Sequence, residues 1–531
     1  MKNHHSKSLL FTALTVSFLA GGGLLASVTY AQNTLPPAAL PANGEYNVRA
    51  FGARGDSVTL DSDAINRAIE AASKAGGGTV RVPAGTYISL SIRLESNIRL
   101  HLDAGAVVEA AERTETRRYD DPEKNDFKEY QDFGHSHGRN SLIWGEDLEN
   151  VTIDGPGEIY GKGLVDGLGD KAPKIQGTAN KAIALKSCHN VNIKDIIIRH
   201  GGWFAMLLTG VDNLVLDNLK IDTNRDGIDI DCCRNVRVSN CSVNTPIDDG
   251  ICLKSSYALN EARAPENVTI SNCYVSGYVE GTMLDGTRVY DPKKATGGRP
   301  TGRIKFGTES NGGFKNITIS NCVFEKCRGL ALETVDGGLL EDVSISNITM
   351  RDTGNSPIFM FLGRRMRGPE GVPIGKLRRI NISNIVAYNV DPKSCVLITG
   401  VPDHPIEDVS LSNIQIWFQG GGTAEQAAIE PPDRANTYPE PASFGAMPAY
   451  GFYLRHIKGL TLDNIQLHTL TDDARPPIVL SDVNGAEFFR IKADRAAGVP
   501  VFAVKNSSDL TIRLVDGTED KRQKELFQGT M

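Results

Sequence analysis

Apolar and polar residues alternate along most of this chain in short runs that are separated by turns. From residue 142 onward, each run has apolar residues at every second position, which is the period of a β-strand with one buried face. An Asn or Asp opens many of these runs, at Asn190, Asn213, Asn235, Asn267, Asn316, Asp342 and Asp408. A second Asn or Asp recurs shortly afterwards, at Asp195, Asn218, Asn240, Asn272, Asn321, Asn347, Asn384, Asn413 and Asn464. The shortest spacing in this second set is 22 residues, from Asn218 to Asn240.

This repeat predicts the fold class. Strands and turns that recur without a helical period indicate a solenoid in which each coil is hydrogen-bonded to the next. A leucine-rich repeat is the main alternative at this repeat length, but its regularly spaced leucines are missing. We therefore expect an all-β protein, a right-handed parallel β-helix. The recurrent asparagines are expected to point inward and to form a ladder between coils, with surface turns as the alternative.

A helix is predicted before the first coils. The segment 61–72 opens with residues that cap helices, has apolar residues at helical spacing and ends near three consecutive glycines. A solenoid needs its end covered, because an open coil would expose core side chains and strand edges. We expect this helix to be that cap, and segments 78–82 and 87–90 to be strands of the first coils.

Composition narrows the set of partners. The 531 residues include 57 Lys plus Arg and 64 Asp plus Glu, a net charge of −7. Nucleic acid is therefore not expected as a partner, because phosphate binding needs a basic surface.

The nine cysteines are an odd number, and Cys241, Cys273 and Cys322 each follow an Asn inside the repeat. We expect mostly reduced thiols in the core of a monomeric protein.

The chain begins with a predicted secretory signal peptide, residues 1–31. A lysine-containing start precedes an apolar run from Leu9 to Val28, and small residues precede a cut after Ala31. A membrane anchor is the alternative, but three glycines interrupt the run and no other run is long enough to span a bilayer. We expect a soluble protein in the periplasm or secreted, with a linker at 32–44, a β-helix domain at 45–515 and a C-terminal tail at 516–531.

Two acidic turns are the strongest candidates for chemistry. The first contains Asp226 and the second contains Asp248 and Asp249, and Asp226 and Asp248 are 22 residues apart, the length of one uninterrupted coil. Equivalent positions on neighbouring coils lie roughly 4.8 Å apart. Carboxylates this close repel, so the pKa of at least one should rise, which keeps one acid protonated beside an anionic neighbour. Ordinary turns and a Ca²⁺ site are the alternatives.

These turns carry a resemblance to a known family. The pattern Asn-x-Asp-Gly-x-Asp at 224–229, Asp-Asp-Gly at 248–250, and the segments 46–56, 83–87 and 155–161 are similar to glycoside hydrolase family 28, the polygalacturonases and their relatives that act on pectin. The resemblance extends from about residue 45 to about residue 515. It implies that the β-helix domain is catalytic and acts on a pectin-type polysaccharide or oligosaccharide.

The resemblance implies an inverting hydrolysis by three aspartates, without a cofactor or metal. Asp248 would protonate the glycosidic oxygen, while Asp226 and Asp249 would hold and deprotonate the attacking water. Asn224 would orient water or substrate. Inversion needs acid and base roughly 6.5 to 9.5 Å apart, so directly stacked carboxylates would have to splay. The long segment 420–447 is expected to wall one end of the site and favour exo-action.

Departures from the family pattern bear on the substrate. A Gly-His-Gly expected after the paired aspartates is absent, and Tyr278, in the stretch found there, is expected to bind substrate. Arg303 and Lys305 follow an insertion, and Ala331 and Glu333 stand where a cationic pair for a uronate is expected. We therefore expect a rhamnogalacturonan-type or otherwise decorated pectin sugar. The candidate replacement cations, with solvated surface charge as the alternative for those on the loop, are Arg288, Lys293, Lys294, Arg299, Arg303 and Lys305.

The remaining candidates have structural alternatives. Trp203, one coil before the acids, is expected either to stack on a sugar or to pack in the core. Asp229 is expected to serve the structure, and His135 and His137 to belong to a loop. Two other functions remain open: a Ca²⁺-dependent β-helix polysaccharide lyase and a carbohydrate-binding solenoid without catalysis.

Overall fold

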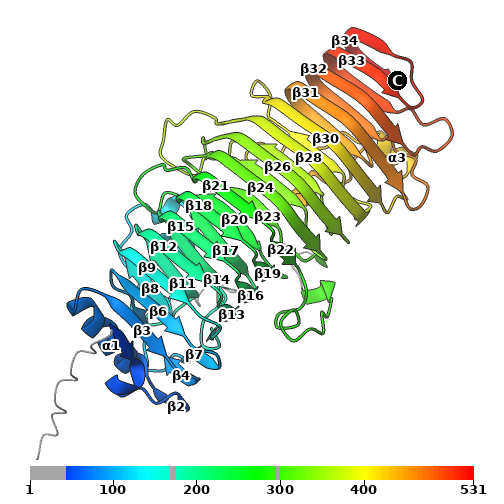
Figure 1. The fold of residues 1–531 in the computed structure, drawn as a ribbon. Helices are drawn as coiled ribbons and strands as arrows, with labels where there is room; N and C mark the ends of the chain where they lie inside the picture. The colour runs from blue at the N-terminus through cyan, green and yellow to red at the C-terminus, as the bar shows by residue number, and fades with distance from the viewer. Residues whose placement is uncertain (1–43, 168–174, 295–297) are drawn as a thin grey trace, which may run out of the picture. The chain divides into compact units, whose positions relative to one another are not determined.

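The computed structural model describes residues 44–167, 175–294 and 298–531. Within these residues the strands wind into successive coils that stack in parallel along one axis (Figure 1), which confirms the predicted right-handed parallel β-helix. The predicted signal peptide and residues 32–43 of the predicted linker lie outside the described residues. No helix in the described part of the chain is long and apolar enough to cross a membrane.

Each coil has three faces, and face 1 carries the strands that position the site. Its strands pair in parallel from one coil to the next. They are β5 (Ile92–Arg93), β8 (Ile143–Glu146), β11 (Lys181–Lys186), β14 (Phe204–Thr209), β17 (Asp226–Asp231), β20 (Ile251–Ser255), β23 (Ile304–Ser310), β25 (Leu330–Thr334), β27 (Ile358–Leu362) and β29 (Val396–Thr399).

The other two faces complete each coil. Face 2 consists of β1 (Glu45–Asn47), β3 (Gly78–Val82), β6 (Ile98–Leu102), β9 (Glu149–Asp154), β12 (His189–Lys194), β15 (Asp212–Asp217), β18 (Arg234–Ser239) and β21 (Glu266–Ser271). Face 3 consists of β2 (Asp56–Leu60), β4 (Gly85–Ser89), β7 (Ala106–Ala110), β10 (Glu158–Tyr160), β13 (Ile197–Arg199), β16 (Lys220–Asp222), β19 (Ser242–Asn244) and β22 (Tyr274–Ser276).

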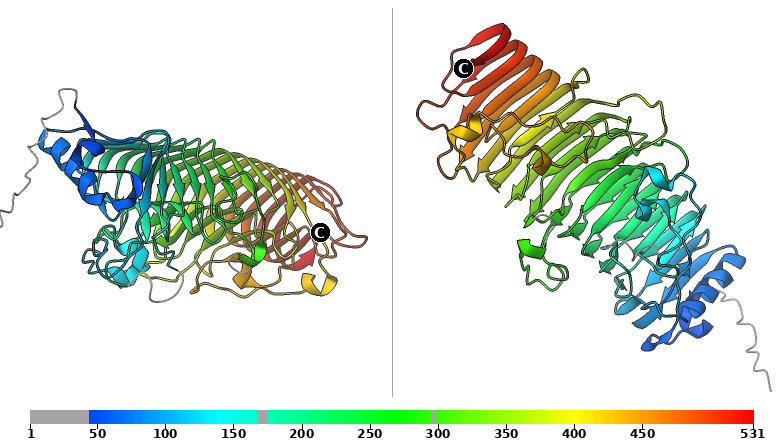
Figure 2. Two further views of the ribbon diagram at one scale, coloured as in Figure 1. Left: turned by 90° about the horizontal axis from the view of Figure 1, so that it is seen from below. Right: turned by 180° about the vertical axis from the view of Figure 1, so that it is seen from behind.

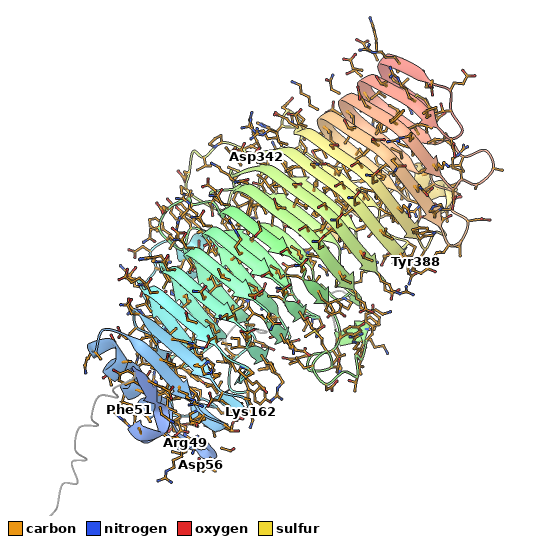
Figure 3. All side chains as sticks on the ribbon, viewed as in Figure 1. Arg49, Phe51, Asp56, Lys162, Asp342 and Tyr388 are labelled. Carbon is orange, nitrogen blue, oxygen red and sulfur yellow. The ribbon has the colours of Figure 1, made fainter. Side chains whose placement is uncertain are left out.

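The strands become longer toward the C-terminus because the corners between faces no longer interrupt them. Faces 2 and 3 share β24 (Phe314–Glu325), β26 (Leu339–Arg351), β28 (Lys376–Val390) and β30 (Ile406–Phe418). All three faces share β31 (Phe452–Thr469), β32 (Ile478–Ala493) and β33 (Phe502–Val515). The last strand, β34 (Lys521–Thr530), pairs antiparallel with β33, so the segment predicted as a tail contains a strand. Figure 3 shows Tyr388 of β28 on the outside of the coils, where it is 40% exposed.

The N-terminal coil is covered by the predicted helix. Helix α1 (Ser62–Lys74) packs on β1, β3 and the short 3₁₀ helix η1 (Val48–Phe51). Its Ile65 and Ile69 are fully buried in the core that runs through the coils. The side chain of Asp61 does not cap the helix but accepts hydrogen bonds from the backbone amides of Arg54 and Gly55. The predicted cap is confirmed.

The asparagines form two ladders, but on the outside of the coils. In one ladder, Asn213 donates to Asn190 (3.0 Å), and in the other Asn347 donates to Asn321 (3.0 Å). Both ladders consist of residues with φ near +55°, a conformation that Asn tolerates at the corners of the coils. The prediction of inward side chains was wrong, because the apolar residues fill the interior and these corners face solvent.

All nine cysteines are buried and unpaired, as expected, and eight of them lie on the first two-thirds of the coils, up to Cys327. The short helices outside the coils include α2 (Phe133–Ser136), α3 (Ala424–Ala427) and the 3₁₀ helix η6 (Pro441–Phe444). Figure 2 shows α2 and α3 on the same side of the coil stack. This side is face 1, because His135 of α2 contacts β17 and the segment after α3 contacts β23.

Candidate active site

Asp226 and Asp249 lie directly above one another on face 1. Asp226 is the first residue of β17, and the amide of the next residue, Gly227, donates to the carbonyl oxygen of Asp249 (3.0 Å) on the following coil. The prediction had stacked Asp248 on Asp226. Asp222 pairs with Asn244, but Ile228 pairs with Ile251, so the second acidic turn is one residue longer than the first.

The close approach of the two turns explains their glycines. A Cβ atom at Gly227 would lie only 2.4 Å from the carbonyl oxygen of Gly250, so this position between the stacked turns admits no side chain. The additional residue in the second turn pushes Asp248 outward, where its carboxylate accepts a hydrogen bond from the amide of Asp249 (3.1 Å). The Asp-Gly pairs therefore belong to the geometry that brings the acids together.

Three carboxylates meet at this point. One oxygen each of Asp226, Asp248 and Asp249 lies within 4.8 Å of the other two. Asp226 and Asp249 are 3% and 2% exposed as residues, whereas the side chain of Asp248 is 28% exposed. Asp248 is therefore the member of the cluster that solvent, or a substrate, reaches most easily.

The two stacked aspartates differ in their electrostatics. Burial and then the carboxylate of Asp248 raise the pKa of Asp226 well above its ordinary value. Burial also raises the pKa of Asp249, but Lys305 and Arg303 together lower it more, and the net pKa lies below the ordinary range. The pKa values of the two stacked aspartates therefore shift in opposite directions, and the repulsion predicted from the sequence contributes to the shift at Asp226 after burial.

Two buried cations hold Asp249 as the anion. Nε of Arg303 lies 2.8 Å from one carboxylate oxygen of Asp249, and Nζ of Lys305 lies 3.2 Å from the other. Both cations are on the next coil, since Arg303 precedes β23 and Lys305 lies within it, and they are only 3% and 1% exposed. Two of the six candidate replacement cations are therefore at the site, but their charges face Asp249.

Glu333 lies on the far side of these cations. Its carboxylate is 3.7 Å from Lys305 and 3.9 Å from Arg303, it is fully buried, and neither oxygen has a hydrogen-bond partner. Burial raises the pKa of Glu333 to about 7, although the two cations lower it. Its contact with a sugar stays a prediction, because in this structure it faces Lys305 and Arg303.

The long segment 420–447 contributes two side chains that the sequence did not single out. The hydroxyl of Tyr438 lies 3.1 Å from Nζ of Lys305, and the ring is 54% exposed. Glu440 lies 3.6 Å from Arg303 and 2.9 Å from Arg328. The segment therefore lies against the site, and its expected effect on exo-action stays a prediction. The sequence signal for the two residues is that they are polar side chains in a Pro-rich loop.

Arg225 links the acids to an aromatic ring. Its guanidinium lies 2.7 Å from the carboxylate of Asp248 and 4.8 Å from the ring centroid of Trp203, which is half-buried. Asn224 reaches toward Asp166, with its amide nitrogen 3.4 Å from a carboxylate oxygen. Sequence reasoning missed Arg225, although it directly precedes Asp226. Trp203 and Asn224 are brought to the site, and their contacts with substrate stay predictions.

Tyr278 is not brought to the aspartates. Its backbone amide donates to the side chain of Asn244 (2.7 Å), and its ring is buried beside Tyr274 and Glu325 at the end of face 3. Burial raises the pKa of its hydroxyl to about 12. Tyr278 therefore does not take the place of the missing Gly-His-Gly segment at the site. Its predicted role in substrate binding has no support from its position.

A second buried charge cluster adjoins the first through Asp229. Its carboxylate lies 3.2 Å from Nε2 of His135 and 3.7 Å from Lys254, and Asp229 is fully buried. Burial raises the pKa of Asp229, and Lys254 and His135 oppose this shift. The structural role expected for Asp229 agrees with this position, and His135 belongs to α2 and contacts the strand that bears Asp226.

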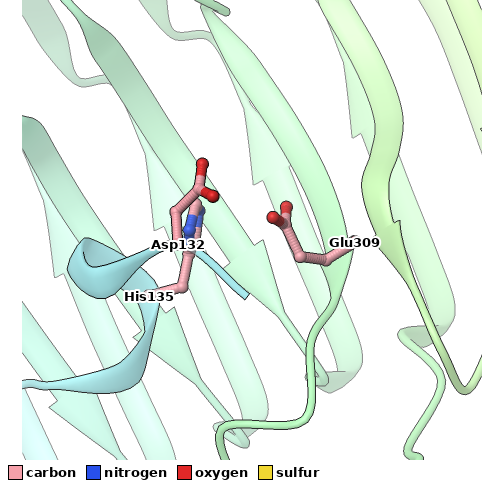
Figure 4. Close-up of side chains that lie close together, drawn as sticks. All are labelled: Asp132, His135 and Glu309. Atoms are coloured by element: carbon pink, nitrogen blue, oxygen red, sulfur yellow. The ribbon is translucent and has the colours of Figure 1, made fainter. Parts of the chain in front are cut away.

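Asp132, His135 and Glu309 each direct a ligand atom to one point, with separations below 4.8 Å (Figure 4). Arg367 binds both acids, since its guanidinium lies 2.8 Å from Asp132 and contacts Glu309. Lys254 lies 3.6 Å from Glu309 as well. These cations neutralise the acids that a metal ion would need, so the cluster is best described as an ion-pair network under α2.

The chemistry available at the first cluster follows from these contacts. A buried anion at Asp249 can accept a proton from water, and the cluster can donate to a leaving group the proton that the raised pKa of Asp226 retains. Such a pair of opposite protonation states is what general acid–base cleavage of a glycosidic bond requires. No thiol, hydroxyl nucleophile or unpaired lysine contacts the three carboxylates among the described residues.

Comparisons with known proteins agree with this geometry. Residues 80–278, which contain all three aspartates, match the model of glycosyl hydrolases family 28. A probable polygalacturonase from Vitis vinifera is 24% identical over 393 residues, covering 69% of this chain and 73% of the relative.

Two solved structures share the fold. An exopolygalacturonase from Thermotoga maritima superposes with a TM-score of 0.56 at 18% identity, covering 92% of this chain and 95% of the other. A family 28 exopolygalacturonase from Yersinia enterocolitica has a TM-score of 0.54 at 18% identity, covering 90% and 79%. The region that matches glycosyl hydrolases family 28 contains the acid turns of β17 and β20, which confirms the resemblance expected from the sequence and supports an O-glycosyl hydrolase.

Proposed function

We propose that this enzyme hydrolyses a pectin-type polysaccharide or oligosaccharide, related to galacturonan or rhamnogalacturonan, from a chain end. The observation that carries the proposal is the meeting of Asp226, Asp248 and Asp249 within 4.8 Å on two neighbouring coils. The relatives named polygalacturonase and exopolygalacturonase support the substrate class. The wall formed by Tyr438 and Glu440 of segment 420–447 supports exo-action.

Asp249 is the base in this proposal, because Arg303 and Lys305 keep it anionic. Asp226 holds the proton of the cluster, because burial and then the carboxylate of Asp248 raise its pKa well above the ordinary value. Asp248 delivers this proton to the glycosidic oxygen because it is the most exposed of the three. Water bound between Asp249 and Asp226 attacks the anomeric carbon, loses its proton to Asp249 and inverts the configuration.

The substrate is expected to be a decorated or rhamnogalacturonan-type pectin. Arg225, Arg303, Lys305 and Arg328, the cations around the aspartates, are each paired with an acid, at 2.7, 2.8, 3.2 and 2.9 Å. Asp166 and Glu440 add further negative charge. The sugar at the cleavage point is therefore better accommodated without a free carboxylate, because no described cation beside the aspartates is left for it.

Product analysis tests the proposal. The enzyme is incubated with homogalacturonan, rhamnogalacturonan and their oligosaccharides, and product size and anomeric configuration are followed by chromatography and proton NMR. We expect small products from one end, with inverted configuration, and faster release from rhamnogalacturonan. Products with retained anomeric configuration would contradict the assignment of Asp249 as base. The test is informative because the carboxylates are closer than the roughly 6.5 to 9.5 Å usual for inversion. Release of nothing from any member of the panel would contradict the pectin assignment.

Export to the periplasm or the medium is part of the proposal, supported by the charged start and the apolar run from Leu9 to Val28. Fractionation of cells that produce the full-length chain, followed by N-terminal sequencing of the mature protein, tests it. A protein that stays in the cytoplasm with its N-terminus intact would contradict export. A monomeric state is expected and is tested by light scattering.

A further inference from the structure

A pocket of about 300 Å³ lies on face 1, several coils beyond the aspartates. It opens between strand β29, the turn before β27 and the segment that follows α3. Its polar lining includes Ser356, Ser394, Gln426, Arg299, Lys393 and Arg475, and its apolar lining includes Leu397 and Met447. This volume is at the lower end of the range for pockets that bind small ligands, which runs from about 300 Å³ upward.

The charge of this pocket is opposite to that of the acid cluster. Three cations line it and no carboxylate does. Two of the cations have acids behind them: Arg299 lies 2.8 Å from Asp391, and Arg475 lies 2.7 Å from Asp473. Lys393 is exposed and forms no ion pair with any described residue. Among the three lining cations, Lys393 is therefore the one without an acid partner in the described part of the chain.

The pocket and the active site share one wall. Pro441 and Ala442 line the pocket and directly follow Glu440, which contacts Arg303 and Arg328 in the active site. Both regions also lie on the same column of face 1, because Lys305 pairs with Ala331 on the next coil and the column continues to Leu397. Leu397 is four coils from the coil of Asp249, roughly 19 Å at the strand spacing of parallel sheets.

We propose that this pocket binds one carboxylate-bearing sugar residue of the substrate, at a distance of a few sugar units from the bond that is cleaved. Lys393 neutralises the carboxylate. The hydroxyls of Ser356 and Ser394, which donate to backbone carbonyl oxygens and to Asn355, accept hydrogen bonds from the sugar, and Leu397 and Met447 close the floor of the pocket. The inference rests on the proposed function for the identity of the glycan. The acidic cleavage site would repel the carboxylate of a uronate. In this proposal the uronate of the polymer therefore binds in the basic pocket and not between the aspartates.

The test measures binding and turnover of acidic oligosaccharides of increasing length. Lys393→Met removes the lining charge that has no acid partner among the described residues, and Ala442→Trp fills the entrance from an exposed position. Lys458→Met, at another exposed lysine on β31, is the matched control. We expect both pocket variants to raise KM about tenfold for oligosaccharides long enough to reach the pocket, with kcat unchanged, and to leave a disaccharide unaffected. Equal KM values for Lys393→Met, Lys458→Met and wild type would overturn the inference.

Calorimetry separates this inference from the proposed function. The full chain with Asp249→Asn is titrated with an acidic pectic oligosaccharide and with the same oligosaccharide after reduction of its carboxyl groups. The inference predicts weaker binding of the reduced oligosaccharide, and no further weakening of it by Lys393→Met. If the wild-type chain binds the acidic oligosaccharide in this way but cleaves nothing, the proposed function fails and the pocket stands. If it cleaves pectin but binds both oligosaccharides equally, the pocket fails and the function stands.

Discussion

One outward-facing column of face 1 has two different characters along its length. In register order it contains Leu207, Asp229, Cys252, Lys305, Ala331, Phe359, Leu397 and Tyr453. In the catalytic coils the column carries buried charge, at Asp229 and Lys305. Beyond Ala331 it is mostly apolar and, with Phe361, Phe444 and Met447, forms a second hydrophobic cluster beneath the segment that follows α3.

The comparison shows that the coil backbone accepts either kind of side chain, provided that a loop covers it. The difference lies in how well the buried atoms are satisfied. One oxygen of Asp229, both oxygens of Glu333 and Nε of Arg225 are buried without a hydrogen-bond partner. Buried unpaired groups of this kind lower stability. The catalytic coils therefore contain buried polar atoms that lower stability but belong to the active site. The apolar coils instead stabilise the fold by packing.

The largest expected effect is on catalysis, in the charged part of the column. Asp249→Asn removes the anion that Arg303 and Lys305 hold, and hydrolysis should fall about 10²-fold to 10⁴-fold, since a general base contributes this much. The kcat is measured on protein whose fold is verified by circular dichroism. Asp403→Asn, an exposed aspartate distant from the site in sequence, is the control and should retain wild-type kcat. A variant at 249 that kept a tenth of the activity would remove Asp249 from the mechanism.

The next effect concerns stability, in the apolar part of the column. Phe361 is fully buried, stacks on Phe359 with ring centroids 6.0 Å apart and meets Phe444 edge-on at 5.7 Å. Phe361→Ala should lower the free energy of unfolding by about 3 to 5 kcal/mol. Val386→Ala, at a side chain that is 43% exposed, should change it by less than about 0.5 kcal/mol. Urea denaturation compares the two, and similar losses would show that the apolar cluster does not stabilise the coils.

A third effect links the two parts through pH. The pKa of Glu333 rises from 4.5 to about 7 on folding, so the folded state holds a proton that the unfolded state releases. The stabilisation is complete below pH 4.5 and is lost as the pH rises through 7, a change of roughly 3 kcal/mol at most. Glu333→Gln should flatten this dependence.

Urea denaturation at several pH values between 4.5 and 7 measures the effect of Glu333. Glu519→Gln, at an exposed glutamate near the C-terminus, is the matched control and should keep the wild-type slope. If Glu333→Gln also keeps that slope, Glu333 is not the group that titrates in this range.

The smallest expected effect lies outside both parts, in the Asn ladders that all coils share. Asn321 has φ of +56° and bonds Asn272 (3.3 Å) and Asn347 (3.0 Å). Asn321→Ala should cost about 1 to 2 kcal/mol, because alanine disfavours this backbone conformation. Asn321→Gly removes the same hydrogen bonds but tolerates the conformation, so it should cost less. Thermal unfolding ranks the stabilities of wild type, Asn321→Ala and Asn321→Gly. An alanine variant as stable as wild type would mean that the ladder does not contribute to stability.

Much of the fold could be predicted from the sequence, because its signals are local and repeated. The alternation within runs and the recurring Asn specify strands and corners, and the capping helix has its own helical period. The direction of the Asn side chains could not be read, because Asn tolerates a corner equally well from either side, and only the packing of the apolar residues decides it. The predicted division into domains and tail is not tested beyond the strand at β34.

The site was predictable only in part, for a geometric reason. The spacing of Asp226 and Asp248 correctly indicated neighbouring coils, but a turn can take one more residue without disturbing the strands around it, and this places Asp249 above Asp226. Partners that arrive from distant segments, such as Tyr438 for Lys305, leave no periodic signal. Burial, which sets the directions of the pKa shifts, depends on these same distant segments.

The most direct test of the central claim is the fate of water oxygen during cleavage. Rhamnogalacturonan or galacturonan oligosaccharides are digested in water labelled with heavy oxygen by the wild-type enzyme and by Asp249→Asn, and the products are analysed by mass spectrometry. The account predicts one labelled oxygen at each new reducing end for the wild type and almost no product for the variant. Unsaturated, ultraviolet-absorbing products without the label, formed only when Ca²⁺ is present, would instead identify a lyase and contradict hydrolysis by the three aspartates.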